Sequence, residues 1–256
     1  MKKLSLRSIF TLIILSFVLV CGQAFAGELR IAADNSVAKL LPDLIKTYNK
    51  TYKEDKISFK AMDSVNIFYN IKQNEAKDFD MTISHDGLVM GSLSDNHLFE
   101  IATRSTIAFT DLYLVTSDKN KSLKSFDDVT TDKVKKLAVV KNTLEARFTV
   151  MIFQKLGVWE KVEGKLAVYD SRKDAAAALA SGKADCALCI APFVEKGMRI
   201  VSKTPKNSHY PVLITIGTVR GTKNLTTASN FSYFLNTPEA KDVIAKHGFR
   251  PGTVTY

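Results

Sequence analysis

The chain has 256 residues, of which 46% are hydrophobic and 24% charged, so it is long enough for one large domain or two modest domains with cores of their own. Lysine and arginine number 36 against 26 aspartates and glutamates, which gives a net charge of +10. A moderately basic surface suits an anionic ligand, whereas a chain with no dense Lys/Arg stripe and only scattered aromatics is a poor nucleic-acid binder.

Residues 1–26 have the pattern of a secretory signal peptide. Three bases and no acid precede an apolar run over 9–20, and Ala24-Phe25-Ala26 supplies the small residues that signal peptidase recognises. The run is too short to span a bilayer, so we expect an exported, periplasmic chain that starts at Gly27. Its 230 residues carry a net charge of +7, because the leader holds three bases and no acid. Cys21 leaves a lipoprotein alternative, although the residue before it is valine, where a lipid-attachment box has a small residue.

After the leader, strand and helix patterns alternate, which predicts an α/β fold. The predicted elements, in chain order, are a strand at 28–33, a helix at 36–50, a strand at 56–61, a helix from 63, a strand at 79–84, a short helix after Ser125, a strand at 136–140, a helix at 145–156, a strand at 166–169, a helix at 172–180, a strand at 184–190 and closing helices at 228–235 and 238–247.

Two strongly apolar stretches, 107–116 and 212–219, are predicted to carry the chain from one lobe to another and back. The sequence has no internal repeat and no low-complexity linker, so two lobes would share two chain crossings. We therefore expect a first lobe of 27–109 with 211–256 and a second lobe of 110–210. Each is expected to be a mainly parallel sheet flanked by helices.

Cys186 and Cys189 are the two cysteines of the exported chain, and their spacing is also found in redox motifs and half zinc sites. The surrounding residues have the pattern of a buried strand, in which residues three apart point to opposite faces, so a disulfide between them is awkward. No second cysteine pair or Cys/His cluster completes a metal site. We interpret both as small buried apolar residues and expect no metal and no cofactor.

Four predicted strands are each followed by a polar turn and the start of a helix. The turns are Asp34-Asn35-Ser36, Asp63-Ser64, Asn142-Thr143 and Asp170-Ser171. Helix N-termini leave backbone N–H groups free and carry partial positive charge, so several of them converging on one cleft would bind an anion. The alternative is ordinary helix capping, which every α/β protein needs.

Ile31-Ala-Ala-Asp-Asn-Ser36-Val resembles the opening strand and serine turn of periplasmic molybdate-binding proteins of ABC importers. Ser64 falls where that family has its second oxyanion-binding serine. Further segments resemble the family in the same order along nearly all of the exported chain: 79–85, 155–159, 175–187, 234–240 and 247–251.

That resemblance implies a two-lobed, type II periplasmic binding fold that closes on a tetrahedral oxyanion, molybdate or tungstate. It implies that serine hydroxyls and backbone amides hold the ligand, with Ser36 and Ser64 as the serines of the first lobe. The partners it implies are the small anion and an ABC permease in the inner membrane, and the protein is expected to be a monomer.

The second lobe departs from the family pattern. The family's helix start aligns with Leu144-Glu145-Ala146, and its ligand-binding turn aligns with Asp170-Ser171-Arg172. Its ligand-binding tyrosine falls near Cys189-Ile190, so that hydroxyl is missing. In the first lobe, Asp34 and Asp63 replace small neutral residues beside the serines.

These departures favour a second class of ligand. Arg147 and Arg172 facing the cleft would add fork-shaped, charge-assisted donors that suit a carboxylate, phosphonate or sulfonate. Asp34 or Asp63 would repel a bare dianion unless it capped a helix or paired with an arginine, and a cleft with both signs would suit a zwitterion. The alternative places the arginines on solvated helix flanks and the aspartates at caps. The candidate ligand-binding residues are Asn35, Ser36, Asp63, Ser64, Glu145, Ala146, Arg147, Ser171, Arg172 and Ile190.

A secreted hydrolase is the remaining alternative, since Ser36 or Ser64 with His85 and Asp86 supplies the residue types of a catalytic triad. Sequence neighbours such as His85 and Asp86 cannot easily hold one another in the base–orienter geometry, and no Gly-x-Ser-x-Gly elbow is present. We therefore expect a binding protein and not an enzyme.

Overall fold

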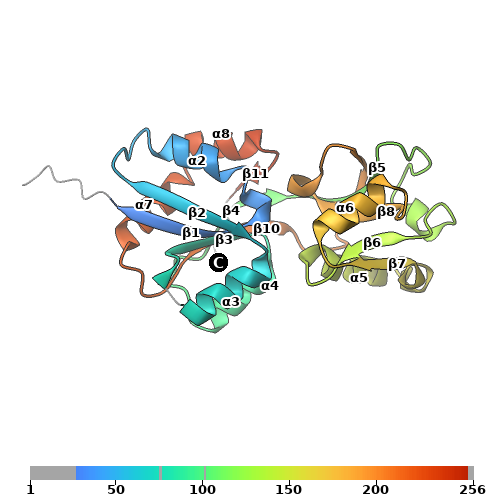
Figure 1. The fold of residues 1–256 in the computed structure, drawn as a ribbon, viewed down its shortest axis with the longest axis horizontal. Coiled ribbons are helices and arrows are strands. Elements are labelled where there is room, and N and C mark those ends of the chain that lie inside the picture. Colours follow the sequence, from blue (N-terminus) through green and yellow to red (C-terminus); the bar gives the residue numbers. More distant parts are fainter. Residues whose placement is uncertain (1–26, 75–76, 101, 253–256) are drawn as a thin grey trace, which may run out of the picture.

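The computed structural model describes residues 27–74, 77–100 and 102–252. The predicted signal peptide, with Cys21, lies outside the described residues. Figure 1 shows two α/β bodies end to end along the long axis, joined near the middle by chain segments. We call the body around the six-stranded sheet the first lobe and the body around the five-stranded sheet the second lobe. Within the described part of the chain, none of the helices combines the length and the hydropathy that a membrane span needs.

The first lobe is built on a six-stranded sheet in the order β11-β4-β10-β3-β1-β2. Its strands are β1 (Glu28–Asp34), β2 (Lys56–Met62), β3 (Met81–Ser84), β4 (Ser105–Thr110), β10 (Val212–Thr218) and β11 (Arg250–Pro251). Its helices are η1 (Asn35–Val37), α2 (Leu41–Tyr48), α3 (Ser64–Asn74), α4 (Gly87–Asp95), α7 (Leu225–Phe234) and α8 (Pro238–Lys246).

The second lobe is built on a five-stranded sheet in the order β7-β6-β8-β5-β9. Its strands are β5 (Leu112–Ser117), β6 (Leu137–Val140), β7 (Leu166–Tyr169), β8 (Cys186–Ile190) and β9 (Met198–Lys203). Its helical segments are η3 (Asp127–Thr130), α5 (Leu144–Lys155), η4 (Trp159–Lys161), η5 (Glu163–Lys165), α6 (Arg172–Ala180) and η6 (Ala191–Phe193).

Both sheets are mixed, so the expectation of a mainly parallel sheet in each lobe is wrong. β1 is parallel to β2 and β3, and β6 is parallel to β7 and β8. However, β10 is antiparallel to β3 and β4, and β5 is antiparallel to β8 and β9. The reason is the double crossing: β5 enters the second lobe from the first and β10 returns, so each runs away from the other lobe while the parallel strands run toward it.

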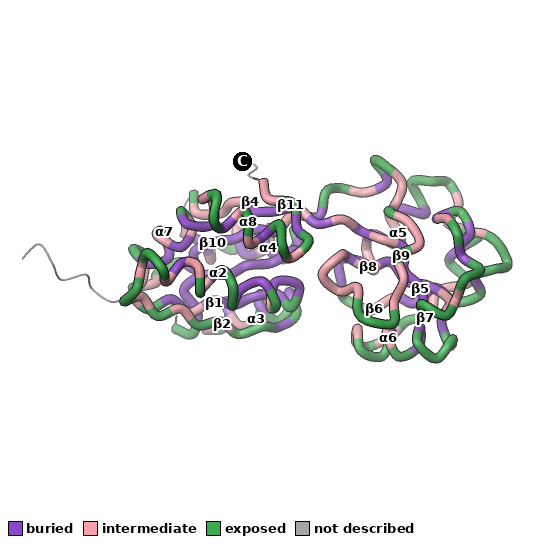
Figure 2. Tube along the Cα trace, turned by 90° about the horizontal axis from the view of Figure 1, so that it is seen from above, coloured by how far each residue is buried: buried purple, intermediate pink, exposed green. Residues whose placement is uncertain are grey.

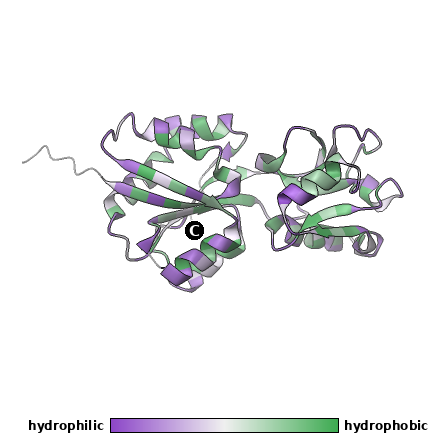
Figure 3. Cartoon of the chain, in the orientation of Figure 1, coloured by the Kyte–Doolittle hydropathy of each residue, from purple (hydrophilic) through white to green (hydrophobic). Residues whose placement is uncertain are grey.

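Apolar side chains at strand and helix periodicity form the cores on both faces of each sheet. In the first lobe Leu41, Leu44 and Tyr48 of α2 are buried against the sheet with Phe231 of α7. In the second lobe Phe153 of α5 is fully buried. Figure 2 shows buried chain along the central strands of both lobes, and Figure 3 shows hydrophobic residues concentrated on the same strands. Each lobe therefore has a core of its own.

The cysteines lie on opposite faces of β8. Cys186 belongs to the core that contains Phe153, and Cys189 packs, half-buried, against the cluster on the other face. Both thiols are free, and burial raises the pKa of each. Among the described residues, no three His, Cys, Asp or Glu side chains gather as a metal site requires.

Candidate functional site

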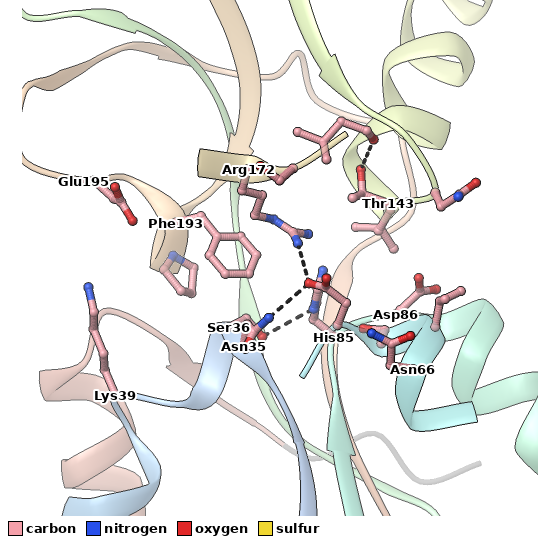
Figure 4. A pocket seen from close by; sticks show the side chains of 18 of the residues that line it. Asn35, Ser36, Lys39, Asn66, His85, Asp86, Thr143, Arg172, Phe193 and Glu195 are labelled. Atoms are coloured by element: carbon pink, nitrogen blue, oxygen red, sulfur yellow. Dashed lines mark hydrogen bonds and ion pairs between the residues drawn. The ribbon is translucent and has the colours of Figure 1, made fainter. Parts of the chain in front are cut away.

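A cavity of about 600 Å³ lies between the lobes, where β1, β2 and β3 of the first lobe and β6, β7 and β8 of the second lobe end. Figure 4 shows side chains from both lobes pointing into it. Six of the ten candidate ligand-binding residues line this cavity: Asn35, Ser36, Asp63, Ser64, Ser171 and Arg172.

The other four candidates lie elsewhere. Glu145 and Ala146 line a neighbouring apolar cavity of about 50 Å³ beneath the starts of α5 and α6, which Arg172 also borders. Arg147 lines neither cavity and instead forms an ion pair with Asp86, 2.6 Å between Nη2 and Oδ2. Ile190 is fully buried in the second-lobe core, because it is the inward-facing residue at the end of β8. The structure does not bring the side chains of Arg147 and Ile190 to the ligand cavity.

All four predicted turns border the large cavity. In the first lobe, η1 starts at Asn35, and α3 starts at Ser64 with the amide of Asn66 donating to the carbonyl of Asp63 at 2.8 Å. In the second lobe, Thr143 caps α5 and Ser171 caps α6 through their hydroxyl oxygens. The structure thus combines the two interpretations of these turns: their residues cap helices, and the capped ends meet at one cavity.

Asp34 anchors the floor of the cavity in the first lobe. Its side chain is buried and accepts hydrogen bonds from the Ser36 amide at 2.7 Å, from His85 Nδ1 at 2.8 Å and from the Ser64 hydroxyl. Asp34, which departs from the family pattern, therefore accepts a hydrogen bond from each candidate serine: from the amide of Ser36 and from the hydroxyl of Ser64.

A chain of hydroxyls fixes the direction of the Ser64 proton. The amide of Asp86 donates to Ser84 Oγ at 3.0 Å, and the two serine oxygens Ser84 Oγ and Ser64 Oγ are 2.9 Å apart. An amide can only donate and an ionised carboxylate can only accept, so the protons run from Asp86 through the serines to Asp34. The hydroxyl proton of Ser64 is committed to Asp34 in this arrangement.

Asp34 and His85 form a buried ion pair. Burial by itself would raise the pKa of Asp34 and lower that of His85, but their mutual charge and hydrogen bond outweigh it. The pKa of Asp34 therefore lies well below its ordinary value, and that of His85 lies above it. Both shifts favour the imidazolium form of His85 and the carboxylate form of Asp34, with Nδ1–H donating to Asp34.

The arrangement of serine, histidine and aspartate is not that of a catalytic triad. In a triad the histidine uses one ring nitrogen for the nucleophile and the other for the carboxylate. Here Ser36 Oγ, at 3.3 Å, and Asp34 Oδ1 both lie at Nδ1 of His85, and Asp86 pairs with Arg147. No described serine lies on Nε2, so the geometry that deprotonates a nucleophile is missing.

Arg172 reaches from the second lobe across the cleft. Its Nη1 lies 3.2 Å from Asp63 Oδ1 of the first lobe, and its Nη2 lies 3.1 Å from Glu145 Oε2. The guanidinium stacks 4.1 Å above the ring of Phe193. The pair between Arg147 and Asp86 likewise joins the two lobes.

Residues 29–250 match the family described as bacterial extracellular solute-binding protein. The chain belongs to this family. The match covers both sheets and the cavity between them, so the cavity lies where two lobes of a solute-binding protein meet.

This solute-binding protein is similar to relatives with different ligands in their names. The molybdate-binding protein ModA of Escherichia coli (strain K12) is 27% identical over 248 residues, covering 92% of this chain and 94% of its own. Two solved structures share the fold. The periplasmic molybdate-binding protein of Azotobacter vinelandii is 17% identical, with 86% of this chain and 98% of that chain covered and a TM-score of 0.70. The sulfate-binding protein SubI of Mycobacterium tuberculosis is 15% identical, with 88% of this chain and 87% of that chain covered and a TM-score of 0.72. The predicted resemblance and the type II periplasmic binding fold are confirmed.

Sequence reasoning missed several residues of this solute-binding protein's cavity. Asp34 was expected as a helix cap or as a source of repulsion and not as the partner of a histidine, and His85 was considered as part of a hydrolase. The cavity is also lined by Lys39, Asn66, Lys141, Phe193 and Glu195. The pairing of Asp34 with His85 joins residues 51 positions apart, and no local pattern in the sequence signals it.

Proposed function

We propose that this solute-binding protein captures a small anion between its lobes and delivers it to the permease of an ABC importer. The observation that carries this proposal is the convergence of four helix starts, two from each lobe, on one cavity. Backbone N–H groups and the positive ends of the helix dipoles favour negative charge there. A ligand that touches both lobes binds the closed arrangement better than the open one and so shifts the protein toward closure.

The ligand we propose first is a tetrahedral oxyanion of the molybdate and tungstate class. The resemblance of Ser36 to a serine of the family supports it, as does the similarity to the molybdate-binding protein ModA. The Ser36 hydroxyl supports it as well: its oxygen lies near the donor His85 Nδ1, so its own proton is free to point into the cavity.

A second candidate ligand is a small organic anion or zwitterion. The observation that favours it is the mixture of charges on the cavity wall, where Arg172 and Lys39 accompany Asp63 and Glu195. An Arg172 guanidinium held over the Phe193 ring suits a carboxylate, phosphonate or sulfonate, and the carboxylates suit an ammonium group.

We further propose that the protein binds without catalysis, since Ser36 and Asp34 share one nitrogen of His85. We also propose an exported, periplasmic location, which the leader pattern supports, and a monomeric state, which the resemblance to the family supports. The lobe boundaries we propose are 27–109 with 211–256 for the first lobe and 110–210 for the second. The passage of the chain between the sheets at Asp111 and again just before β10 supports this division.

The proposed function predicts that oxyanions protect the protein against thermal unfolding. A ligand present at about 100 times its Kd adds about 2.7 kcal/mol to the free energy of unfolding, which raises the melting midpoint. We expect molybdate and tungstate to raise it in a thermal-shift assay. Sulfate, phosphate, a phosphonate and an amino-acid panel are compared at the same ionic strength, with chloride as the control.

Each outcome of that assay separates the candidates. A shift with an organic anion but not with molybdate or tungstate would replace the first ligand by the second. If no anion or zwitterion of the panel moved the midpoint, the proposal of anion capture would be contradicted.

A further inference from the structure

One buried polar atom at the cavity, Nε2 of His85, has no hydrogen-bond partner in the described structure. His85 is 3% exposed and lines the large cavity, and its Nε2 has no hydrogen-bond partner among the described residues. Buried polar groups are nearly always paired, because an unpaired one has lost its hydrogen bonds to water without replacement. An unpaired ring nitrogen at a ligand cavity therefore points to a ligand atom as its partner.

We propose that His85 is an anion-binding residue of this protein and that its Nε2–H donates a hydrogen bond to the captured oxyanion. The inference rests on the proposed function, which supplies the anion, and it adds a cationic donor to a site otherwise built from hydroxyls and backbone amides.

The contacts of the ring fix its orientation. Nδ1 is held by Asp34 Oδ1 at 2.8 Å on the buried side, and Nε2 lies on another edge of the imidazole. The ring of Phe193, which comes from the second lobe, lies edge-on with centroids 5.9 Å apart. Figure 4 shows His85 beside Asn35 and Ser36, below the end of Arg172. The ring is thus anchored at one nitrogen and presents the other where the two lobes meet.

The protonation state of His85 determines whether its Nε2 donates or accepts a hydrogen bond. The imidazolium form carries a proton on both nitrogens, so with Nδ1–H given to Asp34 the Nε2–H is a donor and not an acceptor. The charged groups that act on His85 are Asp34 and Glu145, which favour the imidazolium, and Arg172, which opposes it. A donor of this kind selects an anionic acceptor, and its hydrogen bond is about twice as strong as a neutral one.

The ion pair with His85 also offsets the repulsion that the charge of Asp34 would exert on an anion. Asp34 caps η1 and pairs with His85, so the floor of the cavity carries no net charge from these two residues. The anion then meets the Nε2–H of His85, with the negative charge of Asp34 behind it and already hydrogen-bonded.

The test compares two substitutions of His85 with a surface control. Asn keeps a donor at the Nδ1 position toward Asp34 but ends short of Nε2, whereas Gln reaches the Nε2 position with a neutral amide. Molybdate affinity is measured by isothermal titration calorimetry at pH 6.5. We expect His85→Asn to weaken binding about 10–100-fold, His85→Gln to weaken it less, and His97→Asn, at an exposed histidine, to leave it unchanged.

A second measurement needs no substitution. In protein labelled with ¹⁵N on its histidine side chains, molybdate should shift the Nε2 resonance of His85 more than those of the other histidines. Because the ion pair raises the pKa of His85, molybdate affinity should hold at low pH and fall as the pH rises through that pKa. In His85→Asn the fall should be absent.

The outcomes separate the inference from the proposed function. If molybdate binds the wild-type protein, but His85→Asn binds it within about twofold and the Nε2 resonance does not move, the inference is overturned and the proposed function stands. If no anion or zwitterion of the panel, inorganic or organic, binds the wild-type protein, both are overturned. If His85→Asn does not fold, the resonance of the wild-type protein decides alone.

Discussion

Replacing Arg172 with alanine should weaken anion binding about 100-fold in calorimetric titrations with molybdate. Arg172 is the guanidinium that lines the cavity from the second lobe while contacting Asp63 of the first. Removing it also leaves Glu145, 7% exposed, as an uncompensated carboxylate in the cavity that neighbours the ligand cavity. Truncating one member of a buried, hydrogen-bonded charge pair costs about 2–5 kcal/mol, and the pair of Arg172 with Glu145 is part-buried, which places its cost at the lower end.

Arg147→Ala is the matched control for Arg172→Ala. Arg147 also forms an ion pair across the lobes, with Asp86, but it does not line the cavity. A loss of affinity confined to Arg172→Ala would show direct contact with the ligand, and Arg172→Lys should fall between because lysine keeps the charge but not the fork. Equal losses in both alanine variants would mean that the arginines act only by holding the lobes together, contrary to the proposed contact.

Replacing Asp80 with alanine should lower the free energy of unfolding by about 3–5 kcal/mol, measured by equilibrium urea denaturation. Asp80 is fully buried and accepts hydrogen bonds from three groups of Arg30, from Thr222 and from Asn224. These contacts join β1 to the segment that leads into α7, so they connect the two chain segments that make up the first lobe. Its loss removes a buried acceptor that Arg30 shares with the part-buried donors of Thr222 and Asn224.

The pH dependence of stability gives Asp80 a signature. Burial by itself would raise its pKa, but the hydrogen bonds from Arg30, Thr222 and Asn224 outweigh it and lower the pKa. A depressed pKa in the folded state contributes stability above the ordinary aspartate pKa of about 3.9, and that contribution is lost as the pH falls through the folded-state value. Asp80→Asn should remove this part of the acid sensitivity.

Asp43→Ala is the control for Asp80→Ala, because Asp43 is exposed and contacts His247 at the surface. It should lower the free energy of unfolding by less than about 1 kcal/mol. An equally small loss in Asp80→Ala would contradict the role of the Asp80 network.

The order of elements was predictable because the periodicity of apolar residues reflects burial on one face. The strand at 166–169 and the helix at 172–180 are observed with the predicted bounds, since Ser171 caps the helix and a short apolar run marks the strand. Helix α4, by contrast, was not predicted: Gly87 and Gly91 interrupt its pattern, and the cap from Asp86 is its main signal. Sheet direction was predicted wrongly, because the reversal of β5 and β10 comes from tertiary connection and leaves no local pattern.

The cavity was predictable only where the strand–turn–helix pattern reaches it. That pattern identified Ser36, Ser64 and Ser171 as cavity residues, and family resemblance added Arg172. It could not identify the partner of Asp34, because His85 follows a different strand and becomes its neighbour only when β1 and β3 pair side by side. Ile190 was expected in the site because alignment gives position along a strand but not the depth of the side chain.

The position of the bound anion tests anion capture between the lobes most directly. Crystals of the exported protein grown with tungstate would locate the metal by its anomalous scattering. We expect one strong peak in the cavity between the lobes, with the tungstate oxygens within hydrogen-bond distance of Ser36 Oγ, His85 Nε2 and Arg172. Tungstate bound only outside this cavity, or contacts with one lobe alone, would contradict capture by closure of the lobes.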